Sequence, residues 1–235
     1  MGEVQAPAVK VFCGYDPREA SGFHVFTQSL IENATVPVSI IPLSGEQRDG
    51  SNTFIYARFF VPYLCGFQGW AIFVDGSDML MRADIADLIG LCDLRSAVQV
   101  VKHDYKTRHP RKYLGTPLET NNADYPRKNW SSVILWNCGH FKNRILTPEY
   151  VDKHDGSHLH RFRWLPDEDI GTLPSAWNAL VGEQGVDGAK IAHFTLGHPG
   201  MKAYRHMPYA DEWLECYARA NRHAGEAVHA HKRAA

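Results

Sequence analysis

The first 45 residues show two short apolar runs, separated by a segment in which apolar residues recur at helical spacing. The runs cover residues 9–15 and 38–43, and each has the length of a buried strand. Between them, Asp16, Pro17 and Glu19 form a helix-start signature, because Asp caps the first turn, Pro fits its first position and Glu its third. The order strand–helix–strand favours a parallel sheet with right-handed crossovers.

The rest of the chain continues this alternation and predicts an α/β fold. Further apolar runs predict strands at residues 71–74, 97–103, 131–139 and 190–195. Helices are expected at residues 53–64 and 85–91, and around Trp213 and Tyr217. Residues 105–129 are polar and contain three prolines. They predict a long irregular segment, which in a compact domain is usually functional or mobile.

Neither an internal repeat nor a linker interrupts the pattern, so we expect one domain. It covers residues 1–205 and is closed by a helix at 206–224. A His-rich tail follows at 225–235, which we expect to be disordered.

The composition, with 44% hydrophobic and 22% charged residues, is ordinary for a soluble globular protein. A net charge of −1 gives no electrostatic case for nucleic acid or anionic membrane as a partner, and no apolar run could span a bilayer. The N-terminus lacks a basic region followed by an apolar stretch, so we expect no signal peptide. Five cysteines without CxxC spacing indicate reduced thiols and a cytoplasmic location.

The predicted strand at 71–74 runs directly into two carboxylates, Asp75 and Asp78, in the stretch FVDGSD. Ligands collect at the carboxyl ends of strands in open α/β sheets, and Gly76 and Ser77 permit a tight turn that brings both carboxylates to one side. Two hard oxygen ligands suit Mg²⁺ or Mn²⁺, with water and substrate phosphates completing the shell. The alternative is an ordinary turn in which Asp78 caps a backbone amide.

A histidine, His193, ends a later apolar strand and precedes a glycine-rich turn in the stretch IAHFTLGHPG. An imidazole added to two carboxylates favours Mn²⁺ over Mg²⁺. Gly197 would let backbone N–H groups approach a phosphate. The alternative is a hydrogen-bonded histidine of the core or surface.

An acidic cluster that includes Asp167 and Glu168 lies between Trp164 and Trp177. Carboxylates accept hydrogen bonds from sugar hydroxyls, and aromatic faces accept the apolar faces of sugar rings. The alternative is a solvated acidic turn that starts a helix at Asp167.

Two further polar positions are candidates for ligand binding. Asn137 lies at the end of the strand predicted at 131–139, where an amide could bind substrate or simply serve a turn. Arg58 lies beside Tyr56 on a mostly apolar predicted helix. A phosphate or ribose partner explains this cation, and a surface ion pair explains it equally well.

In this order, these motifs resemble those of the GT-A glycosyltransferases related to glycogenin and to the bacterial lipopolysaccharide galactosyltransferases. The resemblance spans residues 9 to about 200. The matching pieces are Tyr56 and Arg58, the stretch FVDGSDMLMRADIADL, Asn137 and Gly139, Asp167 to Asp169, and His193 with Phe194 and Gly197. The segments YPRKNWSS, LHRFRWL and LPSAWN are similar to a narrower group of uncharacterised bacterial glycosyltransferases.

The sequence departs from the family pattern at two positions. Its DxxD is one residue longer than the family's Asp-x-Asp, which leaves open which of Asp75, Ser77 and Asp78 bind the metal. The lysine that usually follows the His–Gly turn is absent. Either Lys202 reaches a phosphate in its place or the donor is held differently.

The resemblance implies a Rossmann-like GT-A fold, α/β with a mixed, mainly parallel sheet flanked by helices. It implies transfer of a sugar from a nucleotide-diphosphate donor, UDP-linked, to an acceptor hydroxyl with retention. It also implies a divalent cation, Mn²⁺ or Mg²⁺, held by Asp75, Asp78 and His193. The donor sugar, the acceptor and the oligomeric state are not specified by these residues.

The resemblance also implies roles for other residues. Residues 105–129 would form or cover the acceptor site. Asp167 and Glu168 would face the transferred sugar as catalytic residues. The nucleotide sugar itself would contact Tyr15, Asp16, Tyr56, Arg58, Asp75, Gly76, Ser77, Asn137, Gly197 and Lys202.

Two other classes of protein remain open at this point. A nucleotidyltransferase shares the Rossmann-like start and a metal-bound carboxylate pair, but its basic, glycine-rich phosphate loop is poorly matched by CGYDPREASG. A non-catalytic module that binds nucleotide or carbohydrate would keep the same scaffold and dispense with the missing lysine.

Overall fold

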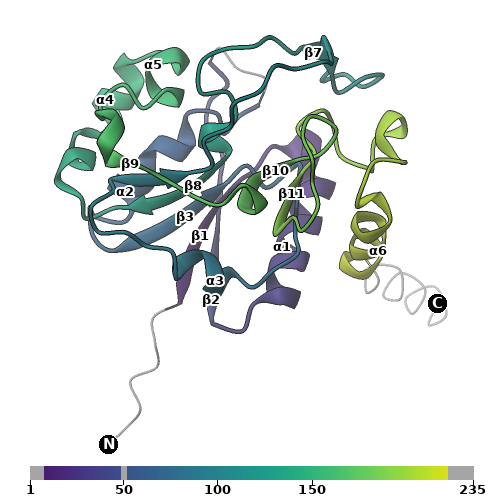
Figure 1. Cartoon of the computed structure of the whole chain (residues 1–235), viewed down its shortest axis with the longest axis horizontal. Helices are drawn as coiled ribbons and strands as arrows, with labels where there is room; N and C mark the ends of the chain where they lie inside the picture. Colours follow the sequence, from purple (N-terminus) through teal and green to yellow (C-terminus); the bar gives the residue numbers. More distant parts are fainter. Residues whose placement is uncertain (1–7, 49–51, 222–235) are drawn as a thin grey trace, which may run out of the picture.

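Five of the six strands in the central sheet run in the same direction, and β8 runs against both of its neighbours. The computed structural model describes residues 8–48 and 52–221, and Figure 1 shows the sheet at its centre. The strand order is β2–β1–β3–β8–β5–β9. The strands are β1 (Val9–Gly14), β2 (Val38–Leu43), β3 (Trp70–Val74), β5 (Val98–Val100), β8 (Val133–Asn137) and β9 (Ile170–Thr172). The mixed, mainly parallel sheet expected from the sequence is confirmed.

The connection after β1 has the local structure that its residues predict. The side chain of Asp16 accepts a hydrogen bond from the backbone N–H of Arg18, and Pro17 occupies the first position of a short 3₁₀ turn. Helix α1 (Ala20–Asn33) follows and carries the chain across to β2. Strand, helix and strand therefore form the predicted crossover.

Alternate residues of the central strands enter two separate cores, because successive side chains of a strand point to opposite faces. Phe12, Phe73 and Trp136 belong to one core, together with residues of α2 (Val61–Leu64), α4 (Pro148–Lys153) and α5 (Gly156–His160). Cys13 and Val74 belong to the other core, together with residues of α1 and α3 (Ile85–Ile89). Both faces of the sheet are thus covered by helices.

A small second sheet closes one side of the molecule. Its strands are β10 (Ala179–Leu180), β11 (Ile191–His193) and β4 (Met79–Met81), in that order. Helix α1 packs against β4 and against the closing helix α6 (Ala210–Ala220), which Figure 1 shows in yellow. Helix α6 lies within the range 206–224 expected for a closing helix but is shorter than that range. The tail expected at residues 225–235 lies outside the described residues.

The helix expected at residues 53–64 is broken into two short pieces. A 3₁₀ turn covers Ala57–Phe60, and α2 then begins with Pro62 in its first turn, where a missing N–H costs nothing. In this segment Tyr63 is 46% exposed, whereas Tyr56 and Arg58 are buried. Arg58 is drawn inward because main-chain oxygens accept its N–H groups, as described below.

The polar segment at residues 105–129 is irregular apart from a small hairpin, β6 (Arg111–Lys112) and β7 (Thr120–Asn121). Figure 1 shows this hairpin at the top of the view. The backbone N–H of Tyr113 donates to the carbonyl of Leu196 at 2.7 Å, and that of Leu114 donates to the hydroxyl of Tyr204 at 3.0 Å. These bonds tie the hairpin to the segment that follows β11.

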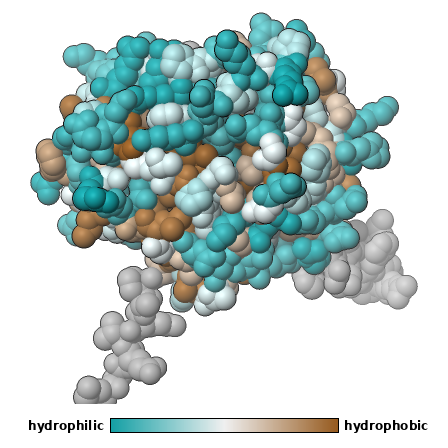
Figure 2. Space-filling model, in the orientation of Figure 1, coloured by the Kyte–Doolittle hydropathy of each residue, from teal (hydrophilic) through white to brown (hydrophobic). Residues whose placement is uncertain are grey.

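The described residues contain no helix of the length and apolar character needed to cross a membrane. All five cysteines are free. On the face shown in Figure 2, apolar residues show through between polar side chains near the middle, and the periphery is mostly hydrophilic.

Candidate functional site

A cavity of about 360 Å³ opens where the chain leaves β1 and β3. Its lining comes from segments far apart in the sequence: the turn after β3, the segment around Arg58, the β6–β7 hairpin, the residues before β8, helix α5 and the end of β11. A cavity of this size holds a small organic ligand, and its position at the carboxyl ends of strands is where α/β folds bind one.

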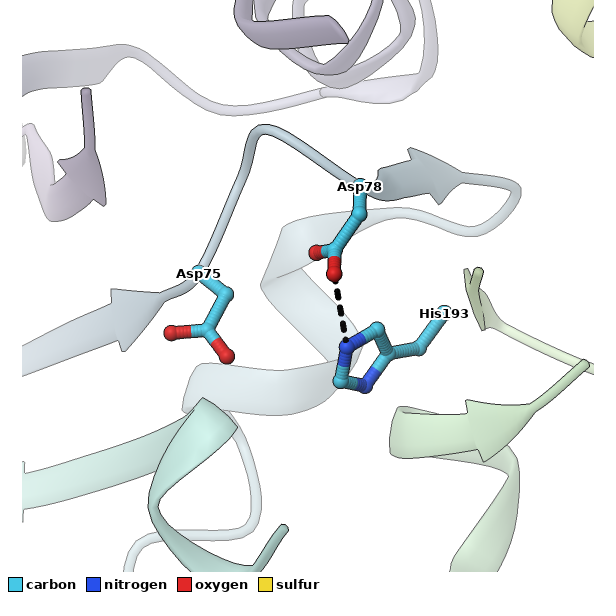
Figure 3. Close-up of side chains that lie close together, drawn as sticks. All are labelled: Asp75, Asp78 and His193. Carbon is cyan, nitrogen blue, oxygen red and sulfur yellow. Dashed lines mark hydrogen bonds and ion pairs between the residues drawn. The ribbon is translucent and has the colours of Figure 1, made fainter. Parts of the chain in front are cut away.

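The turn after β3 is as tight as its glycine suggests. Gly76 has φ +77°, and a Cβ at this position would lie 2.2 Å from the sulfur of Cys13. The N–H of Ser77 donates to the carbonyl of Asp75 at 2.9 Å, which closes the turn. Asp75 and Asp78 therefore leave the turn on the same side (Figure 3).

The end of β11 brings His193 to these carboxylates. Its Nε2 lies 3.3 Å from Oδ2 of Asp78, and one ligand atom from each of Asp75, Asp78 and His193 lies within 4.8 Å of the others. Figure 3 shows the imidazole and both carboxylates pointing toward one another. The three residues expected to gather from the sequence thus do so.

A residue that sequence reasoning missed, Asn178, orients the imidazole. Its Nδ2 donates to the carbonyl of Asn129 at 3.1 Å and lies 3.0 Å from the Ser132 hydroxyl, so its Oδ1 points away as an acceptor. That oxygen lies 2.8 Å from Nδ1 of His193. The imidazole therefore carries a proton on Nδ1 and directs Nε2 at Asp78, which is how outer partners orient histidine ligands.

The atoms around Nε2 fit a divalent cation. A bare lone pair on Nε2 would repel the carboxylate 3.3 Å away, so either a proton or a cation has to lie between them. The second oxygen of Asp78 is buried and has no hydrogen-bond partner in the described part of the chain. Two carboxylates and one imidazole suit Mn²⁺ or Mg²⁺ and leave room for oxygen atoms of a ligand.

Arg58 forms an ion pair with one carboxylate of the cluster, that of Asp75. Its Nε donates to the carbonyl of Ile55 at 3.1 Å, its Nη1 donates to the carbonyl of Ser131 at 2.7 Å, and Nη1 also lies 2.7 Å from Oδ1 of Asp75. Burial raises the pKa of Asp75 to about 6 against the opposing effect of this guanidinium. Burial alone would raise the pKa of Asp78 as well, but the neighbouring imidazole outweighs it and the pKa lies below its ordinary value.

Comparison with known proteins places the chain beside a plant protein. No family model matches it. Protein CDI of Arabidopsis thaliana is 39% identical to it over 237 residues, which cover 91% of this chain and 87% of Protein CDI. The chain belongs to the CDI family.

Solved structures show the fold of this CDI family member. It matches the bifunctional glycosyltransferase WbbM (TM-score 0.56, 17% identity, 93% of this chain) and the glycosyltransferase GlyE of Streptococcus pneumoniae TIGR4 (0.60, 13%, 94%). It spans 51% of the WbbM chain and 64% of the GlyE chain. An active-site mutant of LgtC matches with a TM-score of 0.50 and 12% identity over 90% of this chain. The predicted GT-A glycosyltransferase fold is confirmed.

In this CDI family member, two of the predicted ligand-binding groups lie at the other end of the sheet. β8 is antiparallel to β3, so Asn137 pairs with Trp70 and not with the end that leads to Asp75. Its amide donates to the carbonyl of Ser96 at 3.1 Å. The prediction that Asn137 binds the nucleotide sugar is therefore corrected. Gly139 of the same motif lies beside Gly69.

The acidic cluster lies at that end of the sheet for a different reason, since it precedes a strand that runs parallel to most of the sheet. Asp167 and Glu168 precede β9, whose first residue lies level with Val98 at the far edge of the sheet. Both side chains are exposed, and Asp167 pairs with Arg127. Neither lines the cavity, so the prediction that they face the transferred sugar is corrected.

Lys202 and Gly197 are also outside the cavity lining. Lys202 is exposed, and a Cβ on Gly197 would lie 2.3 Å from the ring of Tyr204, so this glycine makes room for the ring. The lysine that does line the cavity is Lys112, on the β6–β7 hairpin, and Arg58 and Arg161 line it as well. Burial lowers the pKa of Lys112, and Asp78 and Asp75 act in the opposite direction.

Three further residues expected to contact the nucleotide sugar have other partners. Asp16 is fully buried and accepts hydrogen bonds from Arg18 and from the N–H of Thr53. Tyr15 packs edge-on against Phe23, and the ring of Tyr56 lies under the guanidinium of Arg48. None of the three predicted residues lines the cavity, so Asp16 acts here as the helix cap that was its alternative.

Glu19, one turn further on, lines the cavity instead. It is 2% exposed, and its Oε1 has no hydrogen-bond partner among the described residues. Burial raises the pKa of Glu19 to about 8, and the negative charges of Asp78 and Asp16 add to the rise. The helix-start signature predicted a capping role for Glu19, so no sequence pattern pointed to a buried acid at this position.

Proposed function

We propose that the chain is a metal-dependent glycosyltransferase that moves a sugar from a nucleotide-diphosphate sugar to an acceptor hydroxyl. One observation carries the proposal. On a GT-A fold, the carboxylates of Asp75 and Asp78 meet the Nε2 of His193, which Asn178 directs toward them, at the wall of a cavity that also contains Lys112.

The site suits the charge that develops when a sugar leaves a diphosphate. A divalent cation held there would stabilise the negative charge of the leaving diphosphate, a contribution of several kcal/mol in metal enzymes. Lys112 would bind a phosphoryl oxygen on the cavity side of the hairpin, taking the role expected for Lys202. Arg58 would keep Asp75 in place. The cavity walls would exclude water and limit hydrolysis of the donor.

Finer features of the proposal come from the family resemblance. We propose a UDP-linked donor, Mn²⁺ as the preferred ion and retention of configuration. The segment at 105–129 would cover the acceptor side, which its bonds to Leu196 and Tyr204 support. A cytoplasmic location and the absence of a nucleic acid partner stay predictions.

Calorimetry with UDP, with and without Mn²⁺, tests the proposal. We expect the wild-type chain to bind UDP in the presence of Mn²⁺ and to lose this binding with a chelator. Asp78→Ala and His193→Ala should each lower the affinity by at least ~10-fold, because each removes a ligand of the ion. Asp187→Ala, which removes an exposed carboxylate, is the matched control.

Undiminished UDP–Mn²⁺ affinity in both variants would show that the site is wrongly assigned. Incubation with a panel of UDP-sugars then separates an enzyme from a binding module. Slow release of UDP, lost in Asp78→Ala, is the result expected of a glycosyltransferase. Tight binding of UDP without any release would favour a non-catalytic module.

A further inference from the structure

A serine and a histidine from different parts of the chain meet at the cavity wall. Ser131 lies just before β8, and His160 is the last residue of α5. The Oγ of Ser131 lies 2.6 Å from Nδ1 of His160. Both side chains line the cavity, and neither has a part in the chemistry described above.

The surroundings of His160 decide which partner donates. The ring packs edge-on against Phe59, and its Nε2 is buried without a hydrogen-bond partner in the described residues. Burial, with a smaller effect of Arg58, lowers the pKa of His160 well below its usual value, so the ring is neutral and carries one proton. A proton on Nε2 would be a buried donor without an acceptor, and such donors are rare. The proton therefore lies on Nδ1, and His160 donates to Ser131.

This direction leaves the hydroxyl hydrogen of Ser131 unused. Ser131 accepts from His160 through Oγ, and the described residues offer its hydroxyl hydrogen no other acceptor. The side chain is buried and lines the cavity. The hydroxyl is consequently a fixed donor for an acceptor atom of whatever ligand fills the cavity.

The chemistry of the wall around Ser131 matches a sugar better than a phosphate. Tyr125, Asn129 and Ser157 line the cavity with it, and these neutral groups both donate and accept, as sugar hydroxyls do. Arg161 also lines the cavity, and a guanidinium donates to sugar hydroxyls as well as to phosphate oxygens. Lys112 and a cation held by Asp75, Asp78 and His193 are the other groups suited to a diphosphate.

We propose that Ser131 is a specificity-determining residue that donates a hydrogen bond to a hydroxyl oxygen of the donor sugar, and that His160 is the positioning residue that fixes its direction. The inference rests on the proposed function, which supplies the nucleotide sugar. It adds to that function a named contact to the transferred group.

Calorimetry with two ligands tests the contact. Titrations with Mn²⁺ present use UDP and whichever of UDP-glucose, UDP-galactose and UDP-N-acetylglucosamine the wild-type chain binds most tightly. Ser131→Ala should leave the affinity for UDP within about twofold of wild type and lower the affinity for the UDP-sugar by about tenfold, the value of one hydrogen bond. Ser131→Thr keeps the hydroxyl and should recover most of the loss.

The role of His160 is tested by two substitutions of its ring. His160→Asn offers an N–H near the position of Nδ1 and should keep the preference for the UDP-sugar over UDP. His160→Phe keeps the ring shape without the donor and should lose that preference in the same direction as Ser131→Ala. A merely structural role would change the affinities for both ligands together.

Three results would overturn the inference. An unchanged UDP-sugar affinity in Ser131→Ala means that the hydroxyl contacts no part of the sugar. An equal loss for UDP and UDP-sugar means that it contacts the nucleotide or its phosphates. A wild-type chain that binds neither ligand with Mn²⁺ refutes the proposed function and the inference with it. This last result is separate, because it appears before any variant is made.

Discussion

The Nδ1 of His193 and the Oδ1 of Asn178 are 2.8 Å apart, and this hydrogen bond decides which nitrogen of the imidazole faces Asp78. Asn178 is itself held by the Asn129 carbonyl and the Ser132 hydroxyl. The orientation of the histidine at the end of β11 thus depends on the segment that leads into β8. The next four predictions concern residues that form or surround the cluster of Asp75, Asp78 and His193.

Asn178→Leu should lower Mn²⁺ affinity by roughly 10–100-fold, the usual effect of losing the partner that orients a histidine ligand. Leucine has a similar volume but offers His193 no acceptor for its Nδ1–H. Titration calorimetry with Mn²⁺ alone measures the change, and circular dichroism confirms that the variant is folded. Wild-type Mn²⁺ affinity in a folded variant would mean that the imidazole needs no such orientation.

Lys112→Met should lower the affinity for UDP in the presence of Mn²⁺ by about 10-fold or more, because a hydrogen bond to a charged group contributes about 1.5–3 kcal/mol. Lys202→Met is the matched control and should leave the affinity within about twofold, since that side chain is exposed and outside the cavity lining. If Lys202→Met lowered the affinity for UDP more than Lys112→Met, the phosphate-binding lysine would be Lys202, as expected from the sequence.

Glu19 should make the metal-free chain less stable as the pH rises. Its pKa is about 8 in the folded chain and 4.5 ordinarily, so between these values the unfolded chain has released the proton that the folded chain still holds. The free energy of unfolding therefore falls across this window, by on the order of 3 kcal/mol between pH 5 and pH 8. Urea unfolding in the presence of a chelator measures it.

Glu19→Gln removes this titration and should flatten the pH dependence without abolishing it. Asp75, with its pKa raised to about 6, contributes a fall of the same sign below that pH in both chains. Identical slopes for the variant and the wild-type chain between pH 6 and pH 8 would show that Glu19 is not the group that titrates.

Gly22→Ala should destabilise the chain and weaken the metal site together. At an exposed position inside a helix, replacing Gly with Ala stabilises the helix by about 1 kcal/mol. At position 22, however, the added Cβ would lie 1.7 Å from the carbonyl oxygen of Ser77, which lies between Asp75 and Asp78 in the sequence. We expect a loss of roughly 1–3 kcal/mol in unfolding free energy and a lower Mn²⁺ affinity.

Gly185→Ala is the control for this substitution, because nothing lies within 4 Å of the Cβ it would add. It should change neither stability nor Mn²⁺ affinity appreciably. If Gly22→Ala were as stable as this control and bound Mn²⁺ equally well, helix α1 would not be packed against the turn as closely as described.

Much of the fold follows from local patterns in the sequence. The apolar runs predict five of the six strands of the central sheet but not β9, and Asp16 with Pro17 predicts the start of the first helix. The short helices α4 and α5 were missed because five or six residues show too little periodicity. Their caps, Thr147 before Pro148 and Asp155, were signals that could have revealed them.

The cluster of Asp75, Asp78 and His193 was predictable because its members end apolar strands or closely follow them. The direction of each strand was not predictable from the same patterns, and it determines at which end of the sheet Asn137 lies. β8 is antiparallel to β3, so Asn137 ends it away from Asp75, and the residues before this strand, such as Ser131, reach the cavity. Lys112 and Asn178 act through tertiary contacts of irregular segments, which no local spacing encodes.

The guanidinium of Arg58 is held by carbonyl oxygens of Ile55 and Ser131. Main-chain oxygens persist whatever side chain the residue carries. A substitution at position 131 can therefore change the side chain, and with it the sugar that is accepted. The main-chain carbonyl would still hold Arg58 in its ion pair with Asp75. Relatives that differ at this one position would be the natural place to look for a changed choice of donor.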